Sequence, residues 1–260
     1  MEGNVVKQSV IEGKASLGIR IQAVRSLDAV KIFAEAGMQW AWLDCEHGAF
    51  SIERIREFCR YSTAIGLCPV VKVPQLAYHA IAGCLDQEAM GIIVPLVETE
   101  EQALQAVQYS RYPPLGKRGC GLDNNYFGWK GNAAEYMEWA NDNILLILQI
   151  ESETAVENID AIAQVAGVDV LLMGPLDLSV SLGIPGDYSH PRHGEATQRV
   201  LDACKRHGKV FGVPGTVDYA VYWAKRGALF LTIAGDTSIL AAGCSDAIRS
   251  FEDKLTGGTT

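Results

Sequence analysis

The sequence predicts one domain over residues 1–260 with the fold of a (β/α)8 TIM barrel, a closed ring of eight parallel strands surrounded by helices. Three observations support this prediction. Short aliphatic and β-branched runs alternate eight times with helical patterns. Several of these runs are apolar almost throughout, as expected for parallel strands that are covered on both faces. The length of 260 residues suits one such domain, and an open doubly wound sheet commonly has only five or six strands.

Eight strands are expected from the apolar runs. WAWLDC at 40–45 and ILLILQI at 144–150 are typical, because each is a short, mostly apolar run without a helical period. Each run ends in small or polar residues, which marks the point where the chain leaves the sheet. The expected strands are residues 17–22, 40–45, 69–73, 91–96, 144–150, 168–173, 209–213 and 229–234.

Helical patterns occupy the intervals between the strands. Asp28 and Ser238 lie where helix N-caps are expected. Gly66, Gly208 and Gly227 lie where helices should stop, since glycine readily adopts the left-handed conformation of a helix end. The expected helices are residues 28–36, 51–65, 78–84, 100–109, 154–165, 194–206, 217–226 and 238–250.

Residues 111–143 form a long insertion before the fifth strand. The segment is too long for a plain connection, and it carries six aromatic side chains together with the basic pair Lys117 and Arg118. Long connections in compact domains are usually functional. A structural cover, a subunit contact and a substrate flap are all compatible with this composition.

The composition excludes several classes of function. A formal net charge of -9 argues against a nucleic-acid partner, because such binding requires a basic surface. No stretch approaches the roughly 20 apolar residues that span a bilayer, so no membrane partner is expected. The N-terminal residues lack the apolar segment of a secretion signal, which predicts a cytoplasmic protein.

The seven cysteines fit neither a disulfide framework nor a zinc site. Their number is odd, and the sequence contains no CxxC pair. Cys45 lies beside two acids and a histidine, but neighbouring residues on a strand point to opposite faces. We therefore expect a buried structural thiol at this position.

Polar residues at the carboxyl ends of the expected strands are the candidates for chemistry, because barrel enzymes place their active sites at that rim. Few positions satisfy this condition, and all of them should converge on one rim if the strand count is right. They are Asp44, Glu46, His47, Lys72, Gln149, Glu151, Asp177 and Asp236.

Glu151 and Asp177 are the most informative pair among these residues. Two carboxylates from neighbouring strands can supply part of an octahedral oxygen site and leave positions for water and substrate. The alternative is that each carboxylate caps a local turn or helix. Gly174 favours the first interpretation, because bare backbone amides close to Asp177 could receive a substrate carboxylate.

Two further polar features have structural interpretations. HPRH, residues 190–193, could pair two imidazoles on a helical turn, but its proline and its position after GIPGDYS indicate a surface connection instead of a zinc site. Asp236 is expected to anchor the N-terminus of the last helix.

Four segments resemble the metal-dependent (class II) pyruvate aldolases, the family of 4-hydroxy-2-oxoheptanedioate aldolase and 2-dehydro-3-deoxyglucarate aldolase. They are LDCEHGAF, RYPPLGKRGCG, LLILQIESETAVENID and GVDVLLMGPLDLSVSLGIPG. The likeness runs in order from about residue 10 to residue 250. It implies a barrel of the phosphoenolpyruvate/pyruvate type, in agreement with the count of eight units.

The resemblance implies a divalent cation as cofactor, Mg²⁺, Mn²⁺ or Co²⁺. Glu151 and Asp177 match its ligands, and Gln149 lies beside them. The cation would chelate the carboxylate and keto oxygens of pyruvate, acidify the adjacent methyl group and stabilise the enolate that forms. The substrate carboxylate would then contact the backbone of Gly174, Pro175 and Leu176.

The resemblance also implies an acid/base group. His47 matches the histidine of the family that transfers protons through a water molecule, and Asp86 matches the carboxylate associated with it. An imidazole with a pKa of about 6.5 can take and return a proton at neutral pH. Asp44 and Glu46 are expected to support this histidine.

Lys72 departs from the pattern of the family. The segment VVKVP carries a lysine where the family has an arginine that contacts the enolate oxygen and the incoming carbonyl. A point ammonium does not reproduce a forked guanidinium, so the rate, the acceptor or the reaction itself could differ. Lys72 is still expected to stabilise the oxyanion, and a Schiff base between its amine and a ketone is the alternative.

Two residues bear on the second substrate. Arg118 could meet a distal carboxylate of that substrate, or it could form a salt bridge that pins the insertion. Leu176 lies where relatives often carry a smaller side chain, which would narrow the acceptor site.

The resemblance therefore predicts a metal-dependent aldolase, a carbon–carbon lyase that joins pyruvate enolate to an aldehyde and gives a 4-hydroxy-2-oxo acid. Oxaloacetate decarboxylation is an expected side activity, because it passes through the same enolate. The family assembles as a hexamer with the last helix exchanged between subunits. The alternatives are a coenzyme A thioester lyase of the citrate or malyl type, which the acidic composition disfavours, and a pyruvate-binding pseudo-enzyme.

Overall fold

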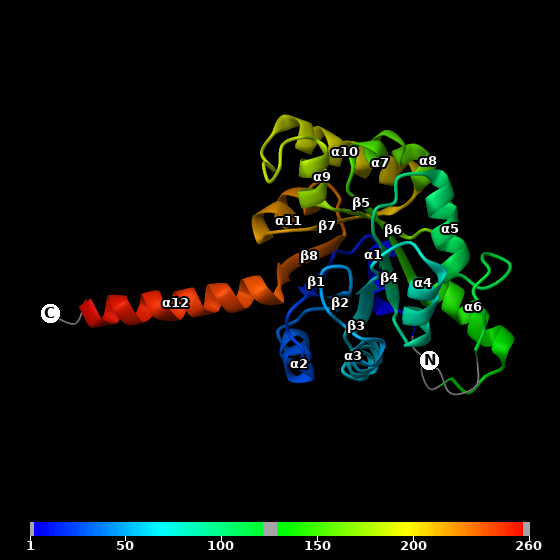
Figure 1. Ribbon diagram of the computed structural model, residues 1–260, viewed down its shortest axis with the longest axis horizontal. Helices are drawn as coiled ribbons and strands as arrows, with labels where there is room; N and C mark the ends of the chain where they lie inside the picture. The colour runs from blue at the N-terminus through cyan, green and yellow to red at the C-terminus, as the bar shows by residue number, and fades with distance from the viewer. Residues whose placement is uncertain (1–2, 122–128, 257–260) are drawn as a thin grey trace.

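The computed structural model describes residues 3–121 and 129–256. Eight parallel strands form a closed barrel in sequence order, with β8 paired to β1 (Figure 1). The predicted fold class is thus confirmed. The strands are β1 Ser16–Ile21, β2 Trp40–Asp44, β3 Cys68–Lys72, β4 Gly91–Val94, β5 Leu145–Ile150, β6 Val170–Met173, β7 Val210–Pro214 and β8 Phe230–Gly235.

All eight predicted strands are present, and their apolar runs are explained by burial on both faces. Every residue of β2, β4, β5 and β6 is buried. β4 ends at Val94, two residues earlier than predicted. Pro95 has no N–H for the ladder, and Leu96 has a φ of 54°, which turns the chain out of the sheet.

Helices surround the barrel, and the predicted ones are present with shifted bounds (Figure 1). The pattern predicted at 154–165 is divided between two short helices at Asn158. Three more helices were not predicted: α1 Val5–Ile11, α6 Ala133–Asn143 and α9 Pro175–Ser181. The others are α2 Leu27–Glu35, α3 Ile52–Ala64, α4 Tyr78–Asp86, α5 Glu100–Ser110, α7 Glu153–Glu157, α8 Ile159–Ala163, α10 Pro191–His207, α11 Val217–Ala224 and α12 Asp236–Thr256.

Two of the expected helix N-caps are wrong. Ser26 caps α2, because its side chain accepts a hydrogen bond from the backbone N–H of Asp28. The last helix begins at Asp236, and Ser238 already lies inside its first turn. Asp236 is an anchor as predicted, since its carboxylate accepts backbone hydrogen bonds from residues 22–24 at the end of β1.

Ion pairs join the lower end of the barrel to α1 and to the start of the insertion. Asp169, just before β6, lies 2.9 Å from the ammonium of Lys7 and 2.6 Å from the guanidinium of Arg111. The same carboxylate accepts a hydrogen bond from the backbone N–H of Leu146 in β5. Removing one member of such a buried group typically costs about 3–5 kcal/mol, so these contacts hold the lower rim together.

The described part of the insertion packs on the side of the barrel. Arg111 is buried, and the rings of Tyr112, Trp129 and Trp139 surround Tyr136 of α6. Residues 122–128, which include two of the six aromatic side chains, lie outside the described residues. The described portion therefore acts as a structural cover; the subunit-contact and flap interpretations stay predictions.

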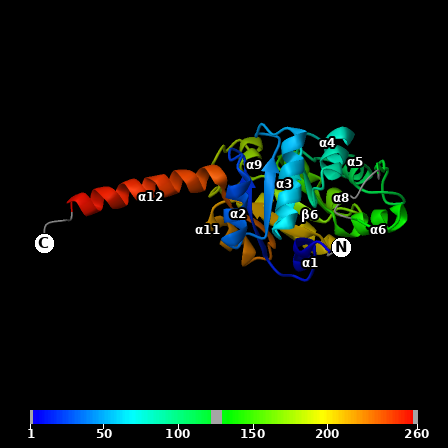
Figure 2. The same cartoon turned by 90° about the horizontal axis from the view of Figure 1, so that it is seen from below.

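The last helix, α12, projects away from the barrel in both views (Figures 1 and 2). Every residue from Thr237 to Thr256 is exposed. Leu240, Ile248, Phe251 and Leu255 nevertheless recur at helical spacing along it. In the described ranges, no helix has both the length and the apolar character needed to cross a membrane.

Candidate active site

The upper rim of the barrel brings the predicted site residues toward one opening, because the carboxyl ends of all eight parallel strands lie there. Asp44 and Lys72 end neighbouring strands and are paired in register. Gln149 lies near the end of β5, and Glu151 directly follows that strand. Gly174 follows β6, and Asp177 lies in the first turn of α9.

The Glu151 carboxylate is fixed by two donors. Oε1 accepts a hydrogen bond of 2.8 Å from the backbone N–H of Leu96, and Oε2 accepts one of 2.5 Å from Nε2 of Gln149. The residue is only 3% exposed. Burial raises the pKa of Glu151 to about 7; Lys72 opposes the rise, while the charges of Asp177 and Glu46 add to it.

Gly174 is required by the position of Glu151. A Cβ atom at residue 174 would lie 2.5 Å from Oε2 of Glu151 and 2.8 Å from Nε2 of Gln149. Only glycine therefore lets β6 pass so close to the carboxylate. Pro175 begins α9, and the exposed side chains of Leu176 and Asp177 follow it at the rim.

Lys72, Glu46 and His47 form a second cluster. The ammonium of Lys72 is almost fully buried and pairs with Oε2 of Glu46. The same oxygen lies 3.3 Å from Nε2 of His47, whose side chain is half exposed. Asp44 is completely buried, and its Oδ1 accepts hydrogen bonds from the backbone N–H groups of Glu46 and His47. These contacts support the expected roles of Asp44 and Glu46 in placing the imidazole.

Cys45 agrees with its structural interpretation. Burial raises the pKa of its thiol to about 12, so the nucleophilic thiolate is scarce at neutral pH.

Asp86 and Arg118 form a pair of their own. Nη2 of Arg118 lies 2.8 Å from Oδ1 of Asp86, and the guanidinium rests 4.6 Å from the ring centre of Tyr112. The Arg118 side chain is only 1% exposed, which favours the interpretation that it pins the insertion. The described contacts join Asp86 to Arg118 and His47 to Glu46; the predicted association of Asp86 with His47 stays a prediction.

The expected surface connection at residues 190–193 is wrong for His193. His190 caps α10 through its ring, but His193 lies inside that helix and is only 1% exposed. Its Nε2 lies 3.1 Å from the carbonyl oxygen of Pro175, so the imidazole braces the start of α9. The expectation failed because the proline before it starts the helix instead of ending one.

The residues at the rim fit a hard divalent cation. Glu151 and Asp177 offer carboxylate oxygens, and Oε1 of Gln149 is buried without a hydrogen-bond partner. A cation would relieve the repulsion between the two carboxylates, and oxygen donors suit Mg²⁺ or Mn²⁺. Over residues 3–121 and 129–256, no group of three or more His, Cys, Asp or Glu side chains is placed to hold a metal ion. Water and substrate would have to complete the coordination.

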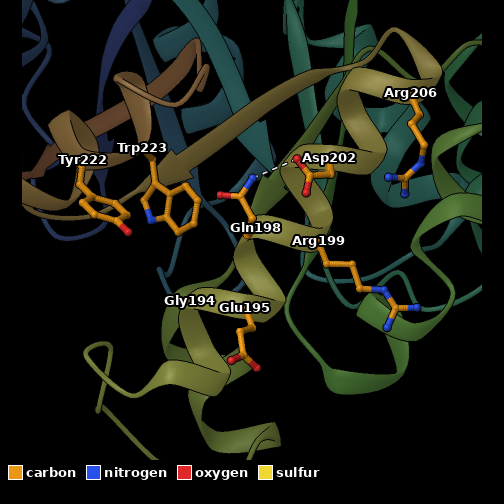
Figure 3. Close-up of a pocket in the computed structure, with 8 residues that line it drawn as sticks. All are labelled: Gly194, Glu195, Gln198, Arg199, Asp202, Arg206, Tyr222 and Trp223. Carbon is orange, nitrogen blue, oxygen red and sulfur yellow. Dashed lines mark hydrogen bonds between the residues drawn. The ribbon is translucent and has the colours of Figure 1, made fainter.

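An outer groove of about 470 Å³ lies between α10 and α11 (Figure 3). On its α10 side two polar side chains bond to each other, since Nε2 of Gln198 donates to Oδ1 of Asp202 at 2.9 Å. The strand-end residues of the rim take no part in this groove. It is lined by Gly194, Glu195, Gln198, Arg199, Asp202, Arg206, Tyr222 and Trp223.

Residues 23–242 match the model of the HpcH/HpaI aldolase/citrate lyase family. The chain belongs to this family. A 2-keto-3-deoxy-L-rhamnonate aldolase of Salmonella gallinarum is 31% identical over 257 residues, which cover 96% of this chain and 93% of that one. This protein is accordingly an aldolase-type lyase.

Two solved structures are similar to this chain over almost its whole length. The HpcH/HpaI aldolase of Desulfitobacterium hafniense is 32% identical with a TM-score of 0.91, over 97% of this chain and 98% of that one. Citrate synthase SbnG is 28% identical with a TM-score of 0.87, over 96% and 98%. Members of the family generally depend on a divalent metal ion.

Sequence reasoning missed two contributors to the site. Leu96 acts through its backbone N–H, which every residue except proline carries, so the side chain gives no signal. Its left-handed conformation costs about 1–3 kcal/mol in a residue that is not glycine. His193 was assigned to the surface because its burial depends on α9, which was not predicted.

The pKa of Glu151 predicts a pH-dependent stability for the metal-free protein. The folded state holds the proton up to pH about 7, whereas an unfolded glutamate releases it near 4.5. The stabilisation from the bound proton is therefore complete below pH 4.5 and is lost as the pH rises through 7. Glu151→Gln keeps a neutral side chain at every pH. Its free energy of unfolding, relative to that of the wild-type protein, should therefore rise by about 3 kcal/mol between pH 4.5 and pH 8.

Urea denaturation across this pH range would measure the difference between the two proteins. Glu138→Gln, at an exposed glutamate on α6, is the control, and its difference from wild type in free energy of unfolding should not change with pH. If the difference for Glu151→Gln also stayed constant with pH, burial would not be raising the pKa of this carboxylate.

Proposed function

We propose that the protein is a divalent-metal-dependent pyruvate aldolase, which reversibly joins pyruvate enolate to an aldehyde and forms a 4-hydroxy-2-oxo acid. The observation that carries this proposal is the buried Glu151 carboxylate close to Asp177 at the barrel rim. Its raised pKa is typical of a group that gains from a bound cation.

The substrate class follows from the chemistry of the relatives. A 2-keto-3-deoxy sugar acid carries its hydroxyl two carbons from the keto group, so retro-aldol cleavage yields pyruvate and an aldehyde. The 2-keto-3-deoxy-L-rhamnonate aldolases at 31% identity support such an acid as the substrate here. Oxaloacetate decarboxylation is proposed as a side activity, because it leaves the same enolate.

Glu151 and Asp177 would hold the cation, with Gln149 beside them. A divalent cation, Mg²⁺, Mn²⁺ or Co²⁺, would act there as a Lewis acid toward the keto oxygen and make the methyl protons of pyruvate more acidic. The backbone of residues 174–176 would receive the pyruvate carboxylate, because glycine at residue 174 lets the chain lie close to Glu151 and Gln149.

The chain's own side chains would move the proton and balance the charge. His47 is half exposed, so its imidazole can take a proton through a water molecule and return it to the aldol oxygen. Glu46 contacts His47 and pairs with Lys72 at the same time. The buried positive charge of Lys72 would stabilise the developing oxyanion, and its pairing with Glu46 disfavours a Schiff base.

A homo-oligomer, proposed to be a hexamer, would explain α12. The helix carries a stripe of exposed apolar side chains that no part of the described chain covers. Such a stripe is unfavourable in water, and a second subunit that covers it would remove this cost. The stripe lies along one side of the helix, which suits exchange between neighbouring subunits.

The functional proposal predicts metal-dependent exchange of the methyl protons of pyruvate for deuterium. Proton NMR should show exchange with Mg²⁺, Mn²⁺ or Co²⁺, after removal of the metal where it broadens the signals. Glu151→Ala and Asp177→Ala should each lower the rate by roughly 100-fold or more, because each removes a ligand. Asp160→Ala breaks an exposed ion pair on α8 and is the control.

Unaffected exchange in either variant would refute that residue as a ligand. Pyruvate binding without exchange under all three metals would overturn the aldolase proposal in favour of a pseudo-enzyme.

Replacement of Lys72 by the arginine expected from the resemblance is predicted to raise aldol activity. Lys72→Arg should raise aldol turnover about tenfold, since a forked guanidinium can bond the oxyanion with two N–H groups. Lys72→Met should lose turnover, because it removes the charge. Sodium borohydride with pyruvate should leave the mass of the wild-type protein unchanged, and a mass increase at Lys72 would establish the Schiff-base route instead.

The proposed assembly predicts that charge on the apolar stripe dissociates the oligomer. Wild-type protein should sediment at about six times the monomer mass. The double variant Ile248→Glu/Phe251→Glu should sediment as a smaller species, because it places carboxylates on the stripe. Arg249→Ala loses only an exposed pair with Asp246 and should keep the wild-type mass. A monomeric wild-type protein would contradict the proposal.

A further inference from the structure

Leu96 adopts a backbone conformation that its side chain does not explain. Its φ is 54°, in the left-handed region that favours glycine. The side chain is 57% exposed, so it is not driven there by burial in the core. A glycine or an asparagine at this position would adopt the same conformation with less strain.

Glu88 has a similar backbone conformation, for a reason that Leu96 does not share. Glu88, with a φ of 71°, is the only other non-glycine residue with positive φ in the described ranges. Its side chain is buried after α4 and accepts two hydrogen bonds from Arg60. Glu88 follows the C-cap of α4, and its N–H and that of Ala89 donate to carbonyl oxygens of the last turn, as is usual where a left-handed residue ends a helix. Leu96 follows a strand and ends no helix, so this explanation does not apply to it.

The backbone of Leu96 has a specific partner. Its N–H donates to Oε1 of Glu151 at 2.8 Å and so connects the end of β4 to the end of β5. Pro95 has no N–H, which makes the amide of Leu96 the first donor beyond Val94, the last residue of β4. The φ of Leu96 sets the course of the chain beyond this N–H, so the left-handed turn lets the chain leave the sheet while the N–H stays bonded to the carboxylate.

We propose that Leu96 is a positioning residue, whose left-handed backbone sets the orientation of the Glu151 carboxylate. This inference rests on the proposed function, in which Glu151 binds the cation. The carboxylate is held at both oxygens, by Leu96 at Oε1 and by Gln149 at Oε2, and these two bonds restrict its rotation. A cation then meets a ligand that is already oriented, which strengthens binding because less freedom is lost.

Two substitutions at Leu96 separate the backbone from the side chain. Leu96→Val strongly resists a positive φ because its Cβ is branched, and should turn the amide away from Glu151. Leu96→Gly removes the side chain but keeps the left-handed conformation available. Leu104→Val, on the exposed side of α5, is the matched control.

Titration of each full-length, metal-free protein with Mn²⁺ alone should distinguish the variants. Leu96→Val should weaken the Kd for Mn²⁺ about tenfold, while Leu96→Gly and Leu104→Val should stay within about threefold of wild type. Equal affinity in Leu96→Val and wild type would overturn the proposal. A loss in Leu96→Gly as large as that in Leu96→Val would also overturn it, because the side chain would then be the cause.

Hydrogen exchange of the Leu96 amide tests the same contact without changing residue 96. In protein labelled with [¹⁵N]leucine, this amide should exchange at least about tenfold faster in Glu151→Ala than in wild type, because its acceptor is gone. Unchanged exchange would overturn the proposal even if Leu96→Val fails to fold. An absence of pyruvate exchange in wild type would refute the aldolase function alone, since neither of these measurements involves turnover.

Discussion

The stacked rings of Trp40 and Phe230 lie where the barrel closes, and the position of every other element depends on that closure. Their centres are 3.8 Å apart across β2 and β8, directly against Gly18 of β1, where a Cβ atom would overlap the indole. Only glycine at residue 18 therefore lets β1 run between its two neighbours. All eight strands run parallel, so their carboxyl ends meet at a single rim. The candidate site residues lie at that rim.

Two clusters of acidic side chains at this rim share one cation, Lys72. Its ammonium pairs with Glu46, and its field also opposes the raised pKa of Glu151. One buried lysine thus lies between acids that follow two different strands. Under the proposed function, the burial that raises the pKa of Glu151 would cost stability without metal, and a bound divalent cation would offset that cost.

The sequence was most informative where burial constrains composition. Strands covered on both faces must be apolar, so runs such as ILLILQI revealed the barrel, and the polar residues that end them revealed Glu151 and Lys72. Contacts between distant elements were not visible: His193 is buried under α9, and the pairing of Arg118 with Asp86 joins segments 32 residues apart. The cap of α2 is a local contact, and Ser26 makes it instead of Asp28. A backbone donor such as the amide of Leu96 leaves no trace in the identity of the side chain.

Gly174 and Leu176 differ sharply in their freedom to change, although they are two residues apart. Any β-carbon at residue 174 would collide with the carboxylate of Glu151, so this position is closed to variation. The side chain of Leu176 is 54% exposed and can change size without disturbing β6. The side chain at residue 176 can therefore vary while the contacts around Glu151 stay the same. Under the proposed function, single substitutions at residue 176 would change the preference for the acceptor and leave the carbon–carbon chemistry intact.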